Sequence, residues 1–263
     1  MNFTICIPTL NEELNINKCL NSIKWAKKII ILDSGSTDNT KKLVKKFTNT
    51  QFKKCPKDFD YVDKLNYFIK ICKTEWILIL DADYVVSKEL SNEIRNLNFK
   101  NIEKKSIFGF KAKIYNKIFN QIISENIYPS KIFLFKKNKV RFIKYGHAEK
   151  IIFNKKVLLL KNNIYHENIK DIKKIKDWKN NQKKYSLKDA HRILKESFFN
   201  LRIQDKFRRL TPANILIAFI YFFFIKKIFF YGEAGFFYLY QRMYYEIVLS
   251  INIIKLKFFK SIK

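Results

Sequence analysis

The sequence contains little glycine, proline or cysteine, and each shortage excludes a class of protein. Only 5 Gly and 4 Pro occur among the 263 residues, which excludes collagen-like and linker-dominated architectures. The four cysteines, which form no CxxC pair, are Cys6, Cys19, Cys55 and Cys72. Their scatter argues against a disulfide framework or a zinc site and favours a reducing compartment. The first residues lack the basic and apolar regions of a secretory signal, so a cytoplasmic protein is expected.

Acidic residues are scarce beside basic ones. The chain has 53 Lys and Arg against 23 Asp and Glu, a formal charge of +30. This excess predicts an anionic partner, which is a nucleic acid, a membrane surface or a phosphorylated substrate. Hydrophobic residues make up 48% of the chain, which excludes disorder as the main state. The length fits one compact domain with an appendage, or two small domains.

The first hundred residues alternate between strand and helix patterns. Apolar runs at residues 3–7, 29–32 and 76–80 predict strands. The helices predicted between and after them cover residues 16–25, 38–47, 61–72 and 88–97. Ser36 or Thr37 is the expected N-cap of the second helix, and Ser87 that of the fourth. Apolar strands separated by helices indicate an α/β fold with a mostly parallel sheet covered on both faces.

The middle of the chain changes character after residue 107. Short apolar or alternating runs at residues 108–114, 132–135, 140–142 and 157–160 predict antiparallel strands rather than further βαβ units. A long polar helix or helix pair is expected over residues 169–201.

Polar clusters follow the three early strands directly. They are Pro8-Thr9-Leu10-Asn11-Glu12, the run from Asp33 to Asp38, and Asp81-Ala82-Asp83. Ligands of an open α/β sheet bind at the carboxyl ends of its strands, so these clusters predict a binding site. Two aspartates at i and i+2 can face one hard dication, while Asp33 beside a glycine turn can hydrogen-bond a nucleoside. Taken singly, a DxD is also common in solvated loops, and DSGST can be a turn with a helix cap.

The three clusters together resemble the motifs of family-2 glycosyltransferases, in which IPTLNE, DSGSTDNT and LDAD form the nucleotide-sugar site. The resemblance implies the GT-A fold, a Rossmann-like domain. It also implies that Asp33 contacts the base, Asp81 the ribose or metal, and Asp83 the metal, with Asn66 near the nucleotide. The nucleotide-sugar-binding residues implied are Pro8, Thr9, Asn11, Glu12, Asp33, Ser34, Gly35, Asn66, Asp81 and Ala82. The cofactor implied is a divalent cation, Mg²⁺ or Mn²⁺.

Later motifs resemble the lipopolysaccharide inner-core β-1,4-glucosyltransferase family. They are Tyr128-Pro129, the run from Ile132 to Phe135, Gly146-His147-Ala148-Glu149 and Ile164-Tyr165-His166. The resemblance implies a metal-dependent inverting enzyme that moves a hexose, glucose from UDP-glucose, onto a lipopolysaccharide core or related surface glycan. The partners are then a nucleotide-sugar donor and a saccharide or glycolipid acceptor.

Inverting transfer requires a general base on the acceptor hydroxyl. By resemblance Glu149 falls at the base position, with His147 as the second candidate, although Glu149 can also be a surface partner of Lys150. His166 resembles the late histidine that completes the metal site with Asp81 and Asp83, and it can equally be a structural histidine. His191 lies in a polar helical stretch and is expected to be solvated.

Residues 198–263 hold 13 of the 26 Phe. Residues 213–225 are uncharged and flanked by Arg208-Arg209 and Lys226-Lys227. As a helix this segment is about 20 Å long, short of the ~30 Å hydrocarbon core of a bilayer. Basic flanks with aromatic faces predict helices that lie in the membrane interface, and a helical hairpin packed on the catalytic domain is the alternative.

The predicted organisation is therefore a GT-A domain over residues 1–205 and an amphipathic tail over residues 206–263. The first comprises a nucleotide-sugar-binding half (1–100), an acceptor-side half (101–167) and a helical part (168–205). The expected location is the cytoplasmic face of the inner membrane, held there by anionic lipid. Two alternatives are a basic nucleic-acid-binding protein and an inactive glycosyltransferase-like scaffold. No helix-turn-helix, zinc-finger or RNP-like run supports nucleic-acid binding.

Overall fold

A computed structural model describes residues 3–125, 129–146, 148–210 and 213–261. The chain forms two compact units. The first comprises residues 1–117, 127–143 and 149–172, and the second comprises residues 118–126, 144–148 and 173–263. The predicted division at residue 205 stays a prediction.

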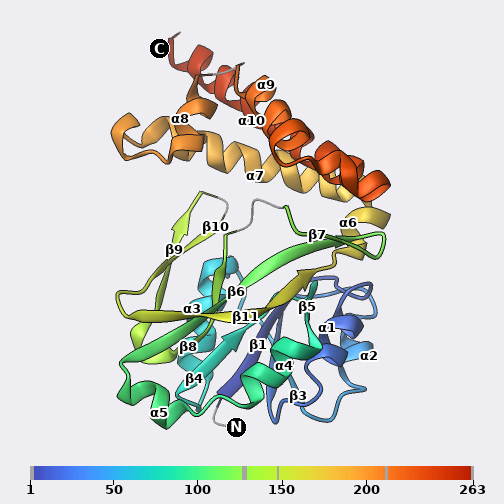
Figure 1. Cartoon of the computed structure of the whole chain (residues 1–263), viewed down its shortest axis with the longest axis vertical. Helices are drawn as coiled ribbons and strands as arrows, with labels where there is room; N and C mark the ends of the chain where they lie inside the picture. Colours follow the sequence, from blue (N-terminus) through green and yellow to red (C-terminus); the bar gives the residue numbers. More distant parts are fainter. Residues whose placement is uncertain (1–2, 126–128, 147, 211–212, 262–263) are drawn as a thin grey trace. The chain divides into compact units, whose positions relative to one another are not determined.

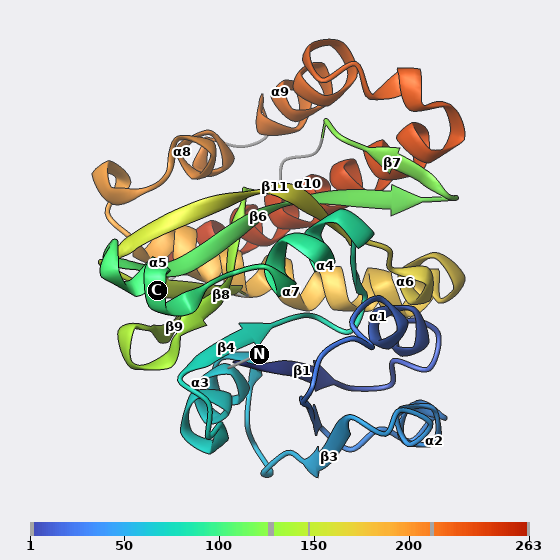
Figure 2. The ribbon, with the colours of Figure 1, turned by 60° about the horizontal axis from the view of Figure 1, so that its bottom comes forward.

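The first unit is built on a large mixed sheet (Figures 1 and 2). Its strands are β1 (Phe3–Thr9), β2 (Ile29–Asp33), β3 (Thr50–Lys54), β4 (Trp76–Ile79), β5 (Tyr84–Val86), β6 (Ile107–Ile118), β8 (Lys131–Lys136) and β11 (Lys156–His166). They follow in the order β3-β2-β1-β4-β8-β6-β11-β5. β3, β2, β1 and β4 pair in parallel, as do β6 and β11, while β8 and β5 run antiparallel to their neighbours. The predicted α/β fold with a mostly parallel sheet is confirmed.

Helices cover both faces of this sheet, and the side chains of its central strands are therefore buried on both sides. The helices are α1 (Ile16–Ser22), α2 (Thr40–Val44), α3 (Tyr61–Ile71), α4 (Lys88–Arg95) and α5 (Phe99–Lys104). Ile5 and Ile29 face the core that α1, α2 and α4 share, and Cys6 and Ile30 face the core under α3. Alternation along each strand thus separates the two hydrophobic layers.

Two local predictions are wrong and one strand was not predicted. The second helix begins at Thr40 rather than after Ser36 or Thr37, because the Ser36 hydroxyl and amide bind Asp33 instead. β11 pairs with β6 in parallel, not antiparallel, because the chain first runs through β8, antiparallel to β6, and then returns on the other side of β6. β3 is polar and half-exposed, so its apolar pattern is too weak to be recognised. Ser87 does cap α4, through a bond from the Leu90 amide of 3.0 Å.

The second unit consists mainly of helices. They are α7 (Ile175–Lys195), α8 (Ile203–Arg209), α9 (Ala213–Ile220) and α10 (Gly232–Ser261), with short 3₁₀ turns at Phe198–Asn200 and Ile228–Tyr231 and a π-helical turn at Tyr221–Ile225. α7 and α10 pack together around Ala190, Ile193, Leu249 and Ile253. β7 (Gln121–Ile123) also belongs to this unit. The chain passes between the two units within β9 (Arg141–Tyr145), β10 (Ala148–Ile152) and α6 (Ile169–Lys173), and β9 and β10 pair with each other. A 3₁₀ turn at Lys137–Lys139 belongs to the first unit.

A buried ionic network ties α7, α8 and α10 together. Asp205 accepts hydrogen bonds of 2.9 Å from both Arg192 and Arg208. Arg208 also donates two bonds to the carboxylate of Glu246, at 3.1 and 2.5 Å. Asn214 donates to the same carboxylate at 2.8 Å. The three charged helices are therefore joined by paired groups rather than by apolar contacts alone.

Replacing Arg208 with Met is expected to lower the free energy of unfolding by about 3–5 kcal/mol, because it leaves Glu246 and Asp205 buried with fewer partners. Thermal and urea unfolding measure this change. Arg95→Met, at an exposed position of α4, is the matched control and should change stability by less than about 0.5 kcal/mol. Equal effects of the two variants would contradict a structural role for the network.

Candidate active site

The predicted polar clusters meet at one edge of the sheet. β1, β2, β4 and β11 run in the same direction, so the loops that follow them leave from the same edge. These loops carry Asn11, Asp33, Asp83 and Asn168. The sequence predicted the first three loops, and the fourth joins them only through the tertiary fold.

Asp33 organises the loop that follows β2. Its carboxylate accepts bonds from the Thr9 hydroxyl (3.0 Å), the Gly35 and Ser36 amides (3.0 and 2.8 Å) and the Ser36 hydroxyl (2.5 Å). Gly35 has a φ of +96°, a conformation that side chains disfavour. These bonds occupy all the acceptor positions of the carboxylate. The predicted contact between Asp33 and a nucleoside base stays a prediction, and in this structure the residue shapes the loop.

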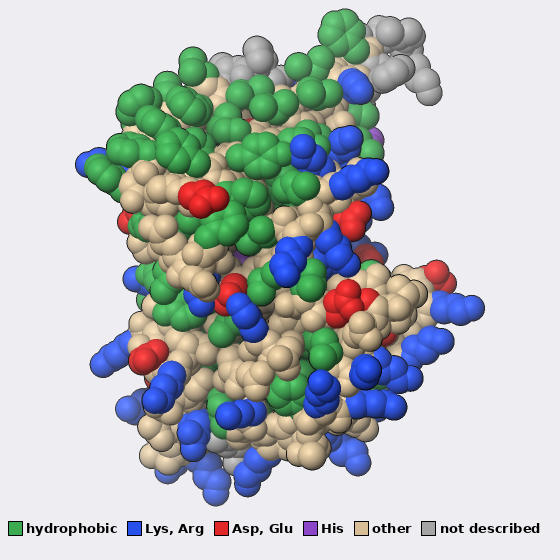
Figure 3. Space-filling model, turned by 90° about the vertical axis from the view of Figure 1, so that its right-hand side faces the viewer, with side chains coloured by type: hydrophobic (Ala, Val, Ile, Leu, Met, Phe, Trp, Pro, Cys, Tyr) green, Lys and Arg blue, Asp and Glu red, His purple; other side chains and the backbone are tan. Residues whose placement is uncertain are grey.

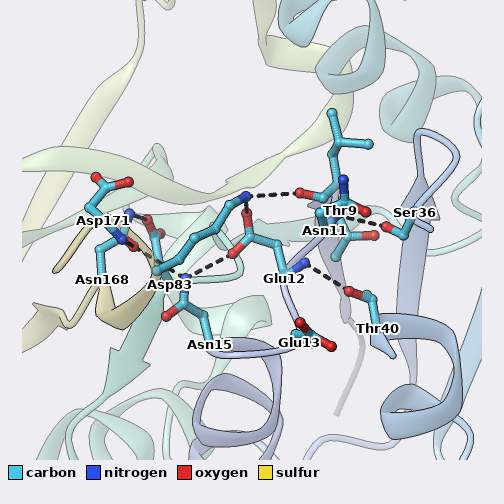
Figure 4. A network of polar contacts seen from close by, with 12 residues as sticks. Thr9, Asn11, Glu12, Glu13, Asn15, Ser36, Thr40, Asp83, Asn168 and Asp171 are labelled. Atoms are coloured by element: carbon cyan, nitrogen blue, oxygen red, sulfur yellow. Dashed lines mark hydrogen bonds and ion pairs between the residues drawn. The ribbon is translucent and has the colours of Figure 1, made fainter. Parts of the chain in front are cut away.

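Asn11 and Glu12 connect the loop after β1 to the loop after β2. The backbone amide of Asn11 donates to the Ser36 hydroxyl at 2.8 Å. The side-chain oxygen of Asn11 accepts from the backbone amide of Thr37 at 2.8 Å. The Glu12 amide donates to the Thr40 hydroxyl at 2.7 Å (Figure 4). Asn11 has a φ of +54°, a backbone conformation that Asn tolerates better than most residues. Hydrogen bonds therefore hold the two loops together.

A second set of bonds runs from Glu12 to Asp83 (Figure 4). Asn15 donates to Glu12 at 2.8 Å and to the Asn168 side-chain oxygen at 3.3 Å. Asn168 in turn donates to Asp83 at 2.9 Å. Burial raises the pKa of Glu12, and burial next to Asp83 raises the pKa of Asp171 to about 6. This chain of contacts joins the loops after β1, β4 and β11 around a group of carboxylates.

His166 faces Asp83 across 3.0 Å, from its Nε2 atom to Oδ2. Its Nδ1 atom lies 3.0 Å from the side-chain oxygen of Asn116, so Nδ1 carries the proton when that oxygen accepts. Burial opposes ionisation of Asp83, but the neighbouring imidazole lowers the pKa of this carboxyl overall. An imidazole and a carboxylate are both donor types that could help to hold a dication.

Asp81 has different neighbours from Asp83. The Tyr61 hydroxyl donates to one of its oxygens at 2.5 Å, and the Lys131 ammonium lies 3.3 Å from the other. Lys131 also lies 3.1 Å from Glu149, whose side chain is 14% exposed. Burial opposes the charge of Lys131, but Asp81 and its other anionic neighbours raise its pKa well above the usual range. Lys131 thereby joins Asp81 to the predicted base.

The other predicted residues lie in different surroundings. Pro8 and Ala82 are buried backbone positions in β1 and after β4. The Asn66 side chain exchanges bonds of 3.0 and 3.1 Å with the backbone of Phe142 in β9, which is a structural role. Ser34 donates its amide to Thr9 at 3.0 Å. His147 lies outside the described residues.

The three predicted metal ligands are only partly brought together. Within the described residues no group of three His, Cys, Asp or Glu side chains lies close enough to hold a metal ion. Asp83 and His166 form a pair, whereas Asp81 is paired with Lys131. Two carboxylates and an imidazole on adjoining loops are nevertheless the donor types that Mg²⁺ and Mn²⁺ accept. The side chains fit a dication, and the complete ligand set stays a prediction.

Sequence reasoning missed Lys131, Tyr61, Asn15 and Asn168. Each is a polar side chain within a predicted helix or strand, or beside one, and carries no motif of its own. Asn15 and Asn168 are separated by 153 positions, so only the folded chain brings them together.

Comparison with known families agrees with this architecture. Residues 4–152, more than half of the chain, match the sequence profile described as "Glycosyl transferase family 2". The chain therefore belongs to this family. The match covers the loops after β1, β2 and β4 and extends to the end of β10.

Individual relatives differ in their sequence identity to this chain and in the share of each chain that the match covers. Glycosyltransferase SunS of Bacillus subtilis is 41% identical over 95 residues, which are 35% of this chain and 22% of that protein. The chain thus matches about a fifth of the length of this relative. An uncharacterized glycosyltransferase of Rickettsia typhi is 26% identical over 244 residues, 88% of this chain and 79% of that one. The lipopolysaccharide core biosynthesis glycosyltransferase LpsC of Rhizobium meliloti is 33% identical over 94 residues, 34% of this chain and 33% of that one.

Among solved structures, residues 1–349 of TarS from S. aureus superpose with a TM-score of 0.47 at 15% identity. That superposition covers 95% of this chain and 90% of the TarS chain.

Proposed function

We propose that this protein transfers a hexosyl group from a nucleotide sugar to a saccharide hydroxyl with inversion at the anomeric carbon. The observation that carries the proposal is the hydrogen-bonded continuity of the loops after β1, β4 and β11, from Glu12 through Asn15 and Asn168 to Asp83. It places carboxylates and an imidazole at the edge of a parallel sheet, where ligands of α/β proteins bind. Membership of glycosyl transferase family 2 supports the same chemistry.

Each group of residues has a role in the transfer reaction that suits its chemistry. The loop shaped by Asp33 and Asn11 holds the nucleoside. Asp83 and His166, with Asp81, would hold a dication, which would offset negative charge on the departing diphosphate. Glu149 accepts the proton of the acceptor hydroxyl. The oxygen of that hydroxyl forms a bond to the anomeric carbon while the bond from this carbon to the diphosphate breaks.

The donor we propose is UDP-glucose and the acceptor a lipopolysaccharide core or related surface glycan. Two similarities support this choice: the later sequence motifs resemble inner-core glucosyltransferases, and LpsC of Rhizobium meliloti matches about a third of the chain. A release assay tests it, in which a panel of UDP-, GDP- and dTDP-sugars is incubated with candidate core oligosaccharides and Mg²⁺ or Mn²⁺. UDP release that needs both UDP-glucose and a core acceptor supports the proposal. Release with another donor alone would overturn the choice of glucose but not the transfer.

Lys131 is expected to position Asp81 and Glu149 for this reaction. Lys131→Met should lower kcat/KM about 10-fold to 100-fold, since hydrogen bonds between charged groups contribute about 1.5–3 kcal/mol. Lys131→Arg keeps the charge and should recover part of the activity, which a purely structural cavity would not explain. Lys139→Met, on a 3₁₀ turn of the same unit, is the control. Unchanged kinetics in Lys131→Met would contradict the assignment.

A further inference from the structure

The second unit exposes large hydrophobic side chains far more often than the first. Among the described residues of the first unit, those at least about a third exposed are Leu10, Ile152, Leu158 and Leu159. The second unit has many more, and Figure 3 shows hydrophobic side chains crowded together over its helices. Monomeric soluble proteins rarely expose large contiguous apolar patches, so this surface calls for a partner.

One strongly exposed part of this surface is the turn between α9 and α10, residues 221–231, which we call the aromatic elbow. Phe224, Ile225 and Phe230 are 59%, 65% and 73% exposed. A π-helical turn and a 3₁₀ turn meet there around Lys227, whose φ is +48°. This left-handed conformation turns the chain sharply between the two helices.

The aromatic elbow is held in place by contacts on its inner side. Phe222 and Ile228 are buried, and the Phe222 ring lies edge-on to Tyr238 of α10 at 6.0 Å. Gly235 lets α10 approach this turn, since a Cβ there would lie 2.0 Å from the carbonyl oxygen of Ile228. The packed inner side fixes which apolar residues point outward, so their exposure is a property of the fold.

Positive charge surrounds the exposed apolar residues. Residues 173–263 contain 20 Lys and Arg against 6 Asp and Glu. Three of those acids, Asp189, Asp205 and Glu246, are buried and bonded within the unit. Lys226 and Lys227 lie in the aromatic elbow itself, where long basic side chains can extend past apolar neighbours toward charged groups. The Lys226 ammonium also pairs with Glu125 at 3.0 Å, a half-exposed contact that anionic headgroups can replace.

We propose that the aromatic elbow inserts into the interface of an anionic lipid membrane, with Lys226 and Lys227 at the level of the lipid headgroups. The positive charge of this surface favours an anionic membrane over a second copy of the chain as its partner. Two copies facing each other would bring together two strongly basic surfaces, whereas an anionic membrane neutralises the charge. Interfacial binding combines the same two ingredients, buried apolar side chains and basic residues.

The described helices of this unit do not form a simple straight span. Among the described residues no single helix is both long and apolar enough to cross a membrane. One bent pair, Asn214–Ile225 with Ile228–Phe258, passes the length and composition test together, with 63° between its parts. The bend lies in the aromatic elbow, which carries the exposed side chains of Phe224, Ile225 and Phe230.

Vesicle sedimentation of the full chain tests the proposal. Vesicles of phosphatidylcholine with 30% phosphatidylglycerol should bind the protein, and pure phosphatidylcholine vesicles should bind it at least tenfold more weakly. The triple variant Phe224→Ser, Ile225→Ser, Phe230→Ser should lose tenfold or more in affinity for anionic vesicles. The matched control Ile152→Ser, Leu158→Ser, Leu159→Ser removes exposed apolar residues of the first unit and should bind within about twofold of wild type.

The double variant Lys226→Gln, Lys227→Gln tests the contribution of charge. It should weaken vesicle binding roughly fivefold per lysine, from about 1 kcal/mol each.

A fluorescent label reports insertion directly. The four native cysteines are buried, so an environment-sensitive dye on Ile225→Cys labels the aromatic elbow selectively. Its emission should shift to the blue with anionic vesicles, whereas dye on Leu159→Cys should not shift, and an alkaline carbonate wash should release the protein. Equal binding by the triple variant, equal binding to both vesicle types, or retention after the wash would each overturn the proposal. Failure to bind vesicles, with a dimer that the triple variant dissociates, would assign the surface to a second copy.

Discussion

Asp83→Asn is expected to reduce sugar transfer about a thousandfold. The substitution keeps the size of the side chain but removes the negative charge that faces Nε2 of His166 at 3.0 Å. It also weakens the bond that Asn168 donates, which links two of the loops at the edge of the sheet. Loss of charge stabilisation for a departing diphosphate costs several kcal/mol, which corresponds to a factor of this size.

Initial-rate kinetics at saturating donor measure the effect of this change. Asp58→Asn is the matched control, because Asp58 is exposed and its φ of +66° suits Asn equally well. Circular dichroism and thermal unfolding separate a loss of activity from a loss of structure. An Asp83→Asn variant with wild-type activity would show that this carboxylate takes no part in the reaction.

Glu149→Gln is expected to lower kcat by about 10² to 10⁴, the usual contribution of a general base. Gln matches the shape of Glu but cannot accept a proton from an acceptor hydroxyl. The KM for the donor should change little, since in our proposal the nucleotide is held by the loops around Asp33 and Asp83 and not by Glu149. Glu75→Gln, at a carboxylate that is 72% exposed and paired with Lys136, should leave kcat unchanged.

A separate comparison identifies the base. Should Glu149→Gln retain activity within about threefold while His147→Ala abolishes it, the histidine would be the base. Both variants inactive, with donor binding intact in both, would assign proton transfer to one and acceptor binding to the other, and solvent-isotope effects would distinguish them.

The fold of the first hundred residues could be predicted from local sequence. Apolar runs mark β1, β2 and β4 because these strands are buried on both faces, and polar residues mark their ends. The loops therefore carry recognisable motifs. Local hydrogen bonds still misled the helix prediction: Ser36 has the chemistry of an N-cap but binds Asp33.

The rest of the site depends on contacts between distant residues. Lys131 reaches Asp81 from β8, 50 positions away, and Asn168 reaches Asp83 from 85 positions away. Neither residue type nor spacing signals such pairs, because strand order alone decides which loops become neighbours. The parallel pairing of β6 with β11 was missed for the same reason. The connection between them includes an antiparallel strand, which the sequence pattern does not reveal.

Calorimetric titration with UDP, with and without Mn²⁺, tests the central claim that this sheet edge binds a nucleotide sugar. The wild-type protein should bind UDP saturably, and Mn²⁺ should tighten the binding. Asp83→Asn should lose the effect of Mn²⁺, while Asp58→Asn should behave like the wild type. No UDP binding by folded wild-type protein, with or without the metal, would contradict the claim.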